Sequence, residues 1–229
     1  MSHIAPLAIH PTVSRIQQML LKIDRLGLTA QSRHDAEHIL VKQVAKVLDR
    51  AIPSHAGHGQ RTARITDMIG QQLALAHETL YHLRLAALLH DIGLLLLPAR
   101  LSDFTNQLDS ESYRVVRNHA RLGGSLLEPF GFLQRASVIV AHHHECWDGS
   151  GYPFGIRGPF IPLEARILSV ADAFDAITVP SVVDHHMRNL IALRILKAGA
   201  GTQFDPEVVK SLDRVVVTST GRRCPREAD

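Results

Sequence analysis

Apolar residues recur at steps of three and four along nearly the whole chain, and this spacing limits the possible folds more than any other feature. It is the spacing of a helix that buries one face. Only Val215 to Thr218 resembles a strand. The pattern therefore predicts an all-α domain, with helices over residues 13–28, 36–48, 58–75, 80–91, 111–128, 132–143, 163–177 and 187–198 and a short one after residue 206.

Composition excludes several classes of protein. The chain has 229 residues, of which 45% are hydrophobic and 21% are charged. This is enough apolar material for a sizeable core, so a disordered or fibrous protein is excluded. The two cysteines, Cys146 and Cys224, are far apart and form no Cys-x-x-Cys pair. We therefore expect neither a disulfide scaffold nor a thiolate zinc finger.

The sequence gives no indication of a membrane span or a secretory signal. The most apolar window, residues 83–97, is interrupted by Arg84, His90 and Asp91. The first eleven residues lack a basic stretch followed by an apolar run. The formal net charge of +3 is mild for a protein that binds a nucleic-acid polymer. We expect a cytoplasmic protein that binds neither membranes nor nucleic-acid polymers.

Histidine and aspartate side chains fall on the apolar faces of five predicted segments. The chain has 15 histidines, more than its Phe, Trp and Tyr residues together. His58, for example, shares a helical stripe with Ile65 and Ile69. The residues placed in this way are His58, the pair His90 and Asp91, His119, His143 and Asp172.

Burying these groups together requires a compensating partner. A polar group buried without a partner costs about 2–7 kcal/mol, and an isolated carboxylate costs far more. One buried histidine alone is usually a satisfied core residue. A divalent metal, in contrast, would offset the cost of all five segments at once, and imidazole with carboxylate suits zinc, iron, manganese or nickel. Without an obvious thiolate, iron or manganese is the better expectation, in a site that leaves a position for water.

The same residues belong to a series of motifs that resembles a known family. The series covers about residues 54–212 and resembles the HD-GYP subgroup of the HD superfamily of metal-dependent phosphohydrolases. The resemblance implies an HD-type helical bundle over residues 51–212, an N-terminal helical extension over 1–50 and a C-terminal tail over 213–229. The motifs are HDIG at 90–93, His119 followed by Gly123, HHECWDGSGYP at 143–153, IPLEARILSVADAFDAIT at 161–178 and GTQFDP at 201–206.

The resemblance also implies a set of metal ligands. Asp91 is expected to bridge two metals. Some family members hold a third metal through a glutamate four residues before the first histidine, and this chain has Ser54 there. Two divalent ions, iron or manganese, are therefore expected. The implied ligands are His58, His90, Asp91, His119, His143, His144 and Asp172.

The activity implied by the resemblance is hydrolysis of cyclic di-GMP to a linear product by a metal-bridging hydroxide. His90 and Asp91 are the implied catalytic residues. Glu145 is expected to orient a histidine. The expected partners are a cyclic dinucleotide, a signalling protein that contacts the loop at residues 148–153 (the GYP loop), and a second copy of the chain. The residues expected to border the substrate pocket or a partner surface are Asp148, Gly151 and Tyr152.

Three departures from the family pattern support alternatives. Leu94, Ser181 and Asp184 stand where the family usually has lysine or arginine side chains that contact phosphate. Losing such contacts favours a catalytically weak or inactive regulatory or binding module, which is the main alternative. A third hypothesis is an HD phosphohydrolase that acts on another nucleotide or a phosphomonoester. The basic residues that could replace the missing contacts, judged by position in the sequence, are Arg100, Arg157 and Arg188.

Overall fold

The computed structural model describes residues 11–22, 30–98, 101, 109–179 and 184–220. Within these ranges the chain forms helices and one isolated β-bridge, between Ala200 and Phe204, and no strand. This confirms the predicted all-α class. The elements are α1 (Pro11–Leu20), α2 (Ala30–Ala51), η2 (Pro53–His55), α3 (His58–Gln72), α4 (His77–Leu89), η3 (His90–Leu96), α6 (Ser110–Val116), α7 (His119–Leu127), η4 (Gly131–Leu133), α8 (Gln134–His142), η5 (Gly158–Phe160), α9 (Leu163–Thr178), α10 (His185–Ala198) and α11 (Pro206–Thr220).

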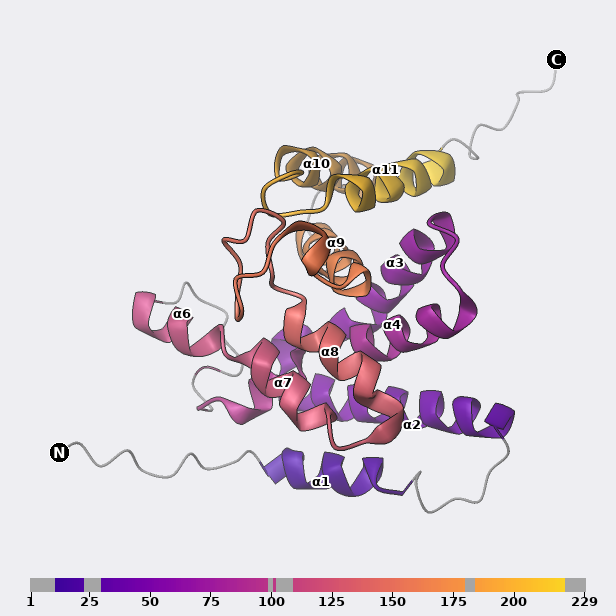
Figure 1. The fold of residues 1–229 in the computed structure, drawn as a ribbon, viewed down its shortest axis with the longest axis vertical. Coiled ribbons are helices and arrows are strands. Elements are labelled where there is room, and N and C mark those ends of the chain that lie inside the picture. Colours follow the sequence, from indigo (N-terminus) through magenta and orange to yellow (C-terminus); the bar gives the residue numbers. More distant parts are fainter. Residues whose placement is uncertain (1–10, 23–29, 99–100, 102–108, 180–183, 221–229) are drawn as a thin grey trace.

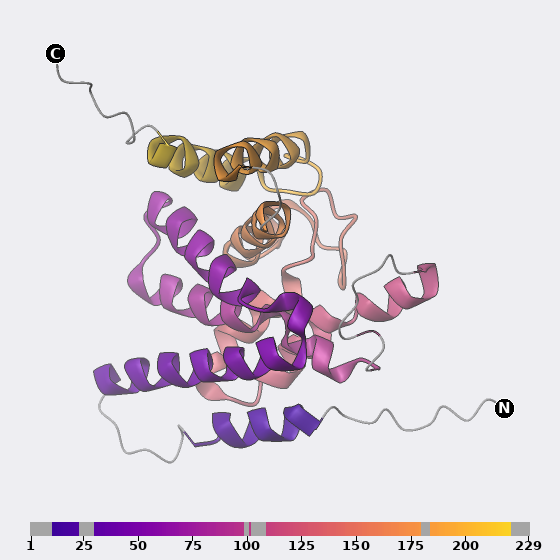
Figure 2. The same cartoon turned by 180° about the vertical axis from the view of Figure 1, so that it is seen from behind.

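The helices form a bundle with a layer of two helices at each end. Helices α1 and α2 pack together at one end, and α10 and α11 pack together at the other (Figures 1 and 2). Helices α3, α4, α7, α8 and α9 lie between these pairs (Figure 1). Helix α4 contacts α2, α3, α8 and α9, which places it at the centre of the bundle.

Helix α4 is apolar on nearly every side, as expected for a central helix. Its last five residues, Leu85 to Leu89, are all buried. By length and composition the segment His77–Leu96 could cross a membrane, but 67% of its most apolar stretch is buried inside the bundle. The end of this helix brings His90 and Asp91 into the interior of the molecule.

The helix predicted over 111–128 is divided into two. Asp109 caps α6 by accepting a hydrogen bond from the Ser112 backbone N–H at 2.7 Å, so the predicted start is confirmed. Helix α6 ends at Val116 because the Asn118 side-chain amide donates to the carbonyl oxygens of Arg114 and Val115. Such side-chain bonds compete with the helical ladder. The chain turns there and α7 begins at His119.

The strand predicted at Val215 to Thr218 is wrong, because these residues belong to α11. The buried residues of α11 include Leu212 and Val216, which are four apart and share one helical face. The helix continues through residue 213, where the tail was predicted to begin.

The predicted helix over 13–28 appears as α1. Residues 23–28 lie outside the described part of the chain, as do Arg100, Ser181 and Cys224.

Candidate metal centre

Most of the predicted ligands lie at the ends of helices. His58 is the first residue of α3 and follows Gly57, whose φ of 73° lies in the left-handed region that glycine tolerates. His90 follows the last residue of α4, and His119 is the first residue of α7. Helix ends are where the chain changes direction, so these residues can converge on one point.

Gly93 allows α7 to approach η3. A Cβ atom at Gly93 would overlap the carbonyl oxygen of His119 and the backbone N of Gly123. Glycine at this position of the HDIG motif therefore permits the close contact between η3 and α7. That contact brings His119 next to Asp91.

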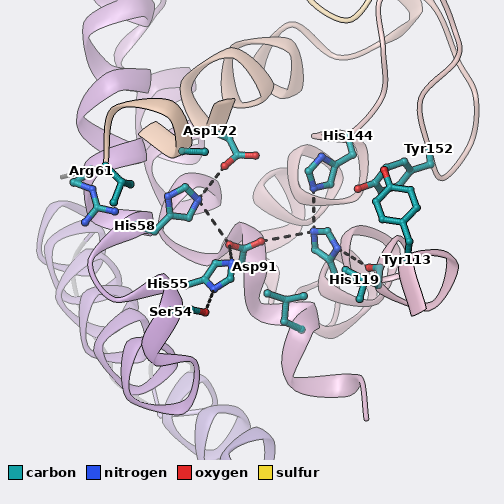
Figure 3. Close-up of a pocket in the computed structure, with 14 residues that line it drawn as sticks. Ser54, His55, His58, Arg61, Asp91, Tyr113, His119, His144, Tyr152 and Asp172 are labelled. Carbon is teal, nitrogen blue, oxygen red and sulfur yellow. Dashed lines mark hydrogen bonds and ion pairs between the residues drawn. The ribbon is translucent and has the colours of Figure 1, made fainter. Parts of the chain in front are cut away.

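The first group of candidate ligands is His58, His90 and Asp172, shown in part in Figure 3. His58 Nε2 lies 2.9 Å from Asp172 Oδ1 and 3.1 Å from His90 Nε2. One ligand atom from each of the three residues lies within 4.8 Å of the others. This arrangement could hold one divalent cation.

The second group is His119, His143 and His144. One ligand atom from each of these residues lies within 4.8 Å of the others. His144 Nε2 lies 3.1 Å from His119 Nε2. His143 is fully buried, and its Nε2 has no hydrogen-bond partner among the described residues. A buried nitrogen without a partner is costly, and a metal ion would satisfy it. The orphaned Nε2 of His143 is therefore consistent with a metal ligand at this position.

Asp91 lies between the two groups. Its Oδ2 is 3.1 Å from His90 Nε2, on the side of the first group. Its Oδ1 is 3.7 Å from His119 Nε2, on the side of the second group (Figure 3). One carboxylate thus faces both groups with different oxygens. This geometry supports the predicted bridging role.

Backbone carbonyls fix the orientation of three of the histidine rings. The Nδ1–H of His90 donates to the Ala87 carbonyl at 2.9 Å, and that of His119 donates to the Val116 carbonyl at 2.8 Å. His143 makes the same contact with Val140 at 2.6 Å. The proton on Nδ1 leaves Nε2 of each ring as the atom available to a metal.

Asp175 orients the remaining buried histidine of the first group, a role that the sequence analysis missed. His58 Nδ1 donates to Asp175 Oδ2 at 2.7 Å, and Arg61 Nε donates to Asp175 Oδ1 at 2.8 Å. Burial lowers the pKa of His58, but hydrogen bonds to Asp172 and Asp175 outweigh it and raise the pKa to about 10. Asp175 follows Asp172 by three residues on α9, so helical spacing was the available indication.

The electrostatics of the two groups differ. Burial, followed by the neighbouring histidines, lowers the pKa of His143 and His144 well below the usual range, and burial lowers that of His119. Burial raises the pKa of Asp91, but His90 and other nearby histidines outweigh it and hold this pKa well below its usual range. The second group is thus ready to bind a cation as neutral imidazoles.

Five of the seven candidate ligands line a cavity of about 320 Å³, and His90 and His143 are not among its lining residues. Two further residues, His55 and Tyr113, point into this region and were not predicted (Figure 3). His55 Nε2 lies 3.7 Å from Asp91 Oδ2. His55 precedes His58 by three residues, but it belongs to η2 and not to the helix whose pattern was analysed. The cavity is lined by Ser54, His55, His58, Arg61, Asp91, Leu94, Tyr113, Val116, His119, His144, Tyr152, Asp172, Ala176 and Val179.

The residues predicted around the GYP loop have different surroundings. Tyr152 lines the cavity, and its ring stacks on His144 with centroids 4.9 Å apart. Asp148 is exposed and accepts hydrogen bonds from Ser150. A Cβ at Gly151 would overlap the backbone of the residues before the loop. Gly151 therefore allows the loop to close tightly.

Glu145 has a different role from the one expected. It is 3% exposed and accepts the backbone N–H groups of Phe154 at 2.7 Å and Ile156 at 3.1 Å. The carboxylate thus fixes the GYP loop. Asp175, and not Glu145, is the carboxylate that orients a histidine.

Two of the three departures from the family pattern lie in the described part of the chain. Leu94 lines the cavity, as expected for a residue at a phosphate-contacting position. Asp184 is exposed and caps α10 by accepting from the His186 N–H at 2.9 Å. Of the basic residues considered as replacements, Arg157 is exposed and does not line this cavity, and Arg188 lines another one.

Comparison with known proteins identifies a family and several relatives. Residues 42–208 match the family model described as HD domain. The chain is 35% identical over 177 residues to the 3'3'-cGAMP-specific phosphodiesterase 3 of Vibrio cholerae, covering 77% of this chain and 38% of that protein. It is 31% identical over 202 residues to the cyclic di-GMP phosphodiesterase response regulator RpfG of Xanthomonas campestris pv. campestris, covering 87% of this chain and 53% of that protein.

A solved structure has the same fold. The HDG"Y"P protein Bd1817 of Bdellovibrio bacteriovorus matches with a TM-score of 0.61 and 17% identity, over 94% of this chain and 75% of that one. The chain spans about half the length or less of the two curated relatives.

Proposed function

The chain belongs to the HD domain family, in its HD-GYP subgroup, and from this premise we propose that it is a metal-dependent phosphodiesterase that hydrolyses a cyclic dinucleotide to a linear product. The observation that supports this most strongly is the pair of ligand groups joined by Asp91 at the wall of one cavity. The names of the relatives point to cyclic di-GMP or 3'3'-cGAMP as the substrate.

The proposed site holds two divalent cations, iron or manganese. His58, His90 and Asp172 would hold one, and His119, His143 and His144 would hold the other. The donor set of imidazole and carboxylate suits either metal. The orphaned Nε2 of His143 and the two-sided contacts of Asp91 support two cations.

The side chains of the site prepare hydrolysis of one phosphodiester bond. When bound, two cations lower the pKa of a water molecule and neutralise negative charge on phosphoryl oxygens. Asp91 remains ionised because its pKa is low, and it keeps its two oxygens directed at the two groups. Burial raises the pKa of Tyr152. Its hydroxyl therefore stays protonated and can donate a hydrogen bond to a phosphate oxygen.

Aromatic side chains at the cavity would position the substrate. Tyr113 and Tyr152 both line it, and the Arg117 guanidinium lies 4.5 Å from the centroid of the Tyr152 ring. Bases of a dinucleotide stack on such rings. Because position 94 is a leucine, Arg61 is the only lysine or arginine among the described residues that line the cavity. The Arg61 guanidinium already pairs with Asp175. Recognition of phosphate would therefore depend mainly on the cations.

The comparisons favour this enzyme over a non-catalytic module, because the relatives are named as phosphodiesterases. A cytoplasmic location, a signalling partner at the GYP loop, a homodimer and the start of the HD-GYP domain at residue 51 remain parts of the proposal.

The experiment is a hydrolysis assay on protein loaded with Mn²⁺ or Fe²⁺, with cyclic di-GMP, 3'3'-cGAMP and an aryl phosphomonoester as substrates. We expect linear dinucleotide from the wild type and none from Asp91→Ala. Asp213→Asn is the matched control, because Asp213 pairs with Lys197 at the surface, 2.8 Å away. Turnover of the monoester alone would instead support the phosphomonoesterase alternative. Absence of turnover on every substrate, with both metals bound, would contradict the proposal.

A further inference from the structure

A second cavity, of about 370 Å³, lies between α3, α9, α10 and α11. Arg61 lines both this cavity and the one at the metal centre. Pockets for small organic ligands begin at about 300 Å³, so the space is sufficient for one. The cavity is lined by Arg61, Arg64, Ile65, Met68, Phe174, Asp175, Thr178, Arg188, Asn189, Leu212 and Val216.

Two neighbouring residues present polar atoms here without partners. Arg188 Nε and Nη1 are buried, and neither makes a hydrogen bond within the described part of the chain. Asn189 is 8% exposed, and its Oδ1 also has no partner there. Buried polar groups are nearly always hydrogen-bonded. Two such groups on one wall of a cavity indicate that a ligand supplies the missing contacts.

Three other partly buried arginines each pair with a carboxylate, whereas Arg188 pairs with none in the described part of the chain. Arg84 pairs with Asp67 at 2.9 Å, Arg166 pairs with Asp205 and Arg61 pairs with Asp175. Among the described residues that line this cavity, Asp175 is the only one with a carboxylate, and its oxygens already accept hydrogen bonds from Arg61 and His58. Arg188 therefore lacks an anionic partner among the described residues.

The charge balance of the cavity favours an anion. Arg64 lines the same cavity, is exposed, and makes no hydrogen bond or ion pair with the described residues. Arg188 and Arg64 thus contribute two positive charges that no carboxylate among the described lining residues neutralises. A guanidinium binds carboxylate and phosphate groups strongly because its N–H donors match their geometry.

The rest of the wall is mostly apolar, and its one further polar residue among those described, Thr178, donates its hydroxyl hydrogen bond to the Phe174 carbonyl oxygen. The apolar side chains are those of Ile65, Met68, Phe174, Leu212 and Val216. We propose that this cavity is a second ligand site, which binds a small organic anion with an apolar body. The anionic group pairs with Arg188 and Arg64, a donor group of the ligand contacts Asn189 Oδ1, and the apolar body packs on Phe174. The site is separate from the catalytic chemistry, and the Arg61–Asp175 pair stands between the two cavities.

The test uses 8-anilinonaphthalene-1-sulfonate, an anion with an aromatic body whose fluorescence rises on binding. We expect saturable binding by the wild type and a Kd about tenfold higher or more for Arg188→Gln, because a charged hydrogen bond is lost. Arg64→Gln should raise the Kd by a smaller factor than Arg188→Gln. Because Arg64 is exposed, we expect the Arg64→Gln variant to fold, so it tests the site even if Arg188→Gln fails to fold. Arg194→Gln is the control, since Arg194 is exposed on the same helix and outside the cavity. Its Kd should stay within about twofold of the wild type.

Displacement of the probe identifies the chemistry of the ligand. Decanoate, guanosine 5'-monophosphate and inorganic phosphate are added separately. Displacement by decanoate points to a carboxylate ligand and displacement by the nucleotide to an organic phosphate, and each supports the proposal. If inorganic phosphate displaces the probe as effectively as the organic anions do, the proposal that the ligand has an apolar body is wrong. Equal Kd values for the wild type, Arg188→Gln and Arg64→Gln, or failure of all three competitors, would overturn the site itself.

Discussion

In the metal-free protein, His58 should hold a proton that a cation must displace. Burial lowers the pKa of His58, but its hydrogen bonds to Asp172 and Asp175 raise the pKa to about 10. At pH 7.5 the ring is therefore charged, and a cation at Nε2 requires it to be neutral. Cation binding to the first group should release at least one proton, and the pKa of His90 is raised as well.

The pH dependence of metal binding follows from the size of the shift in the His58 pKa. Between pH 7 and 9 the Kd of the first group should fall about tenfold for each pH unit. The second group should lack this dependence, since the pKa values of His119, His143 and His144 are lowered. A pKa raised from 6.5 to about 10 stabilises the metal-free fold below pH 6.5 by at most roughly 5 kcal/mol. This stabilisation is lost as the pH rises toward 10.

The assay is isothermal titration calorimetry with Mn²⁺ at pH 7.5, in buffers that differ in ionisation enthalpy. The slope of the observed binding enthalpy plotted against the ionisation enthalpy of the buffer gives the number of protons released on binding. Asp175→Asn replaces the charged acceptor of the His58 Nδ1–H by a neutral one, which should lower the His58 pKa, so this variant should release fewer protons than the wild type. Asp213→Asn should match the wild type. Equal proton release by the wild type and Asp175→Asn, with a Kd for the first cation that is constant from pH 7 to 9, would refute the reasoning.

Three further changes test other parts of the structure. Gly93→Ala forces a Cβ into the His119 carbonyl; it should destabilise the protein by about 1–3 kcal/mol and weaken metal binding, and a thermal midpoint equal to the wild type would count against the close contact. Leu94→Lys places a cation at the cavity and should lower the KM for a cyclic dinucleotide about tenfold or more, whereas an unchanged KM would show that this position does not contact phosphate. Asp109→Ala removes the N-terminal cap of α6 and should lower the free energy of unfolding, measured with urea, by about 1 kcal/mol. The metal content should not change, and a loss of metal would contradict the separation of the cap from the metal site.

The positions of most helices and of six of the seven candidate ligands were predictable because both depend on local periodicity, whereas His144 was given only by the family resemblance. His58, His119 and His143 repeat the spacing of their apolar neighbours, and a residue in an apolar stripe faces the interior wherever the helix packs. Asp172 was found in the same way. The structure brings these residues together in two groups, as the motifs implied.

The features that were missed depend on contacts between segments. Asp175 meets His58 across 117 positions of the sequence. Its spacing of three from Asp172 places the two aspartates on one helical face, but only the folded structure shows that Asp175 contacts His58. Glu145 resembled a partner for a histidine because of its neighbours, yet it accepts from the backbone of the GYP loop. The valine run in α11 was ambiguous, because β-branched residues favour strands and only packing shows that Leu212 and Val216 share a buried helical face.

The central claim is that two groups of side chains, joined by Asp91, each hold one cation. Crystals grown with excess Mn²⁺ and measured by anomalous diffraction test it most directly. We predict two peaks, one among His58, His90 and Asp172 and one among His119, His143 and His144, with Asp91 in contact with both. A single peak, or peaks that Asp91 does not contact, would contradict the claim.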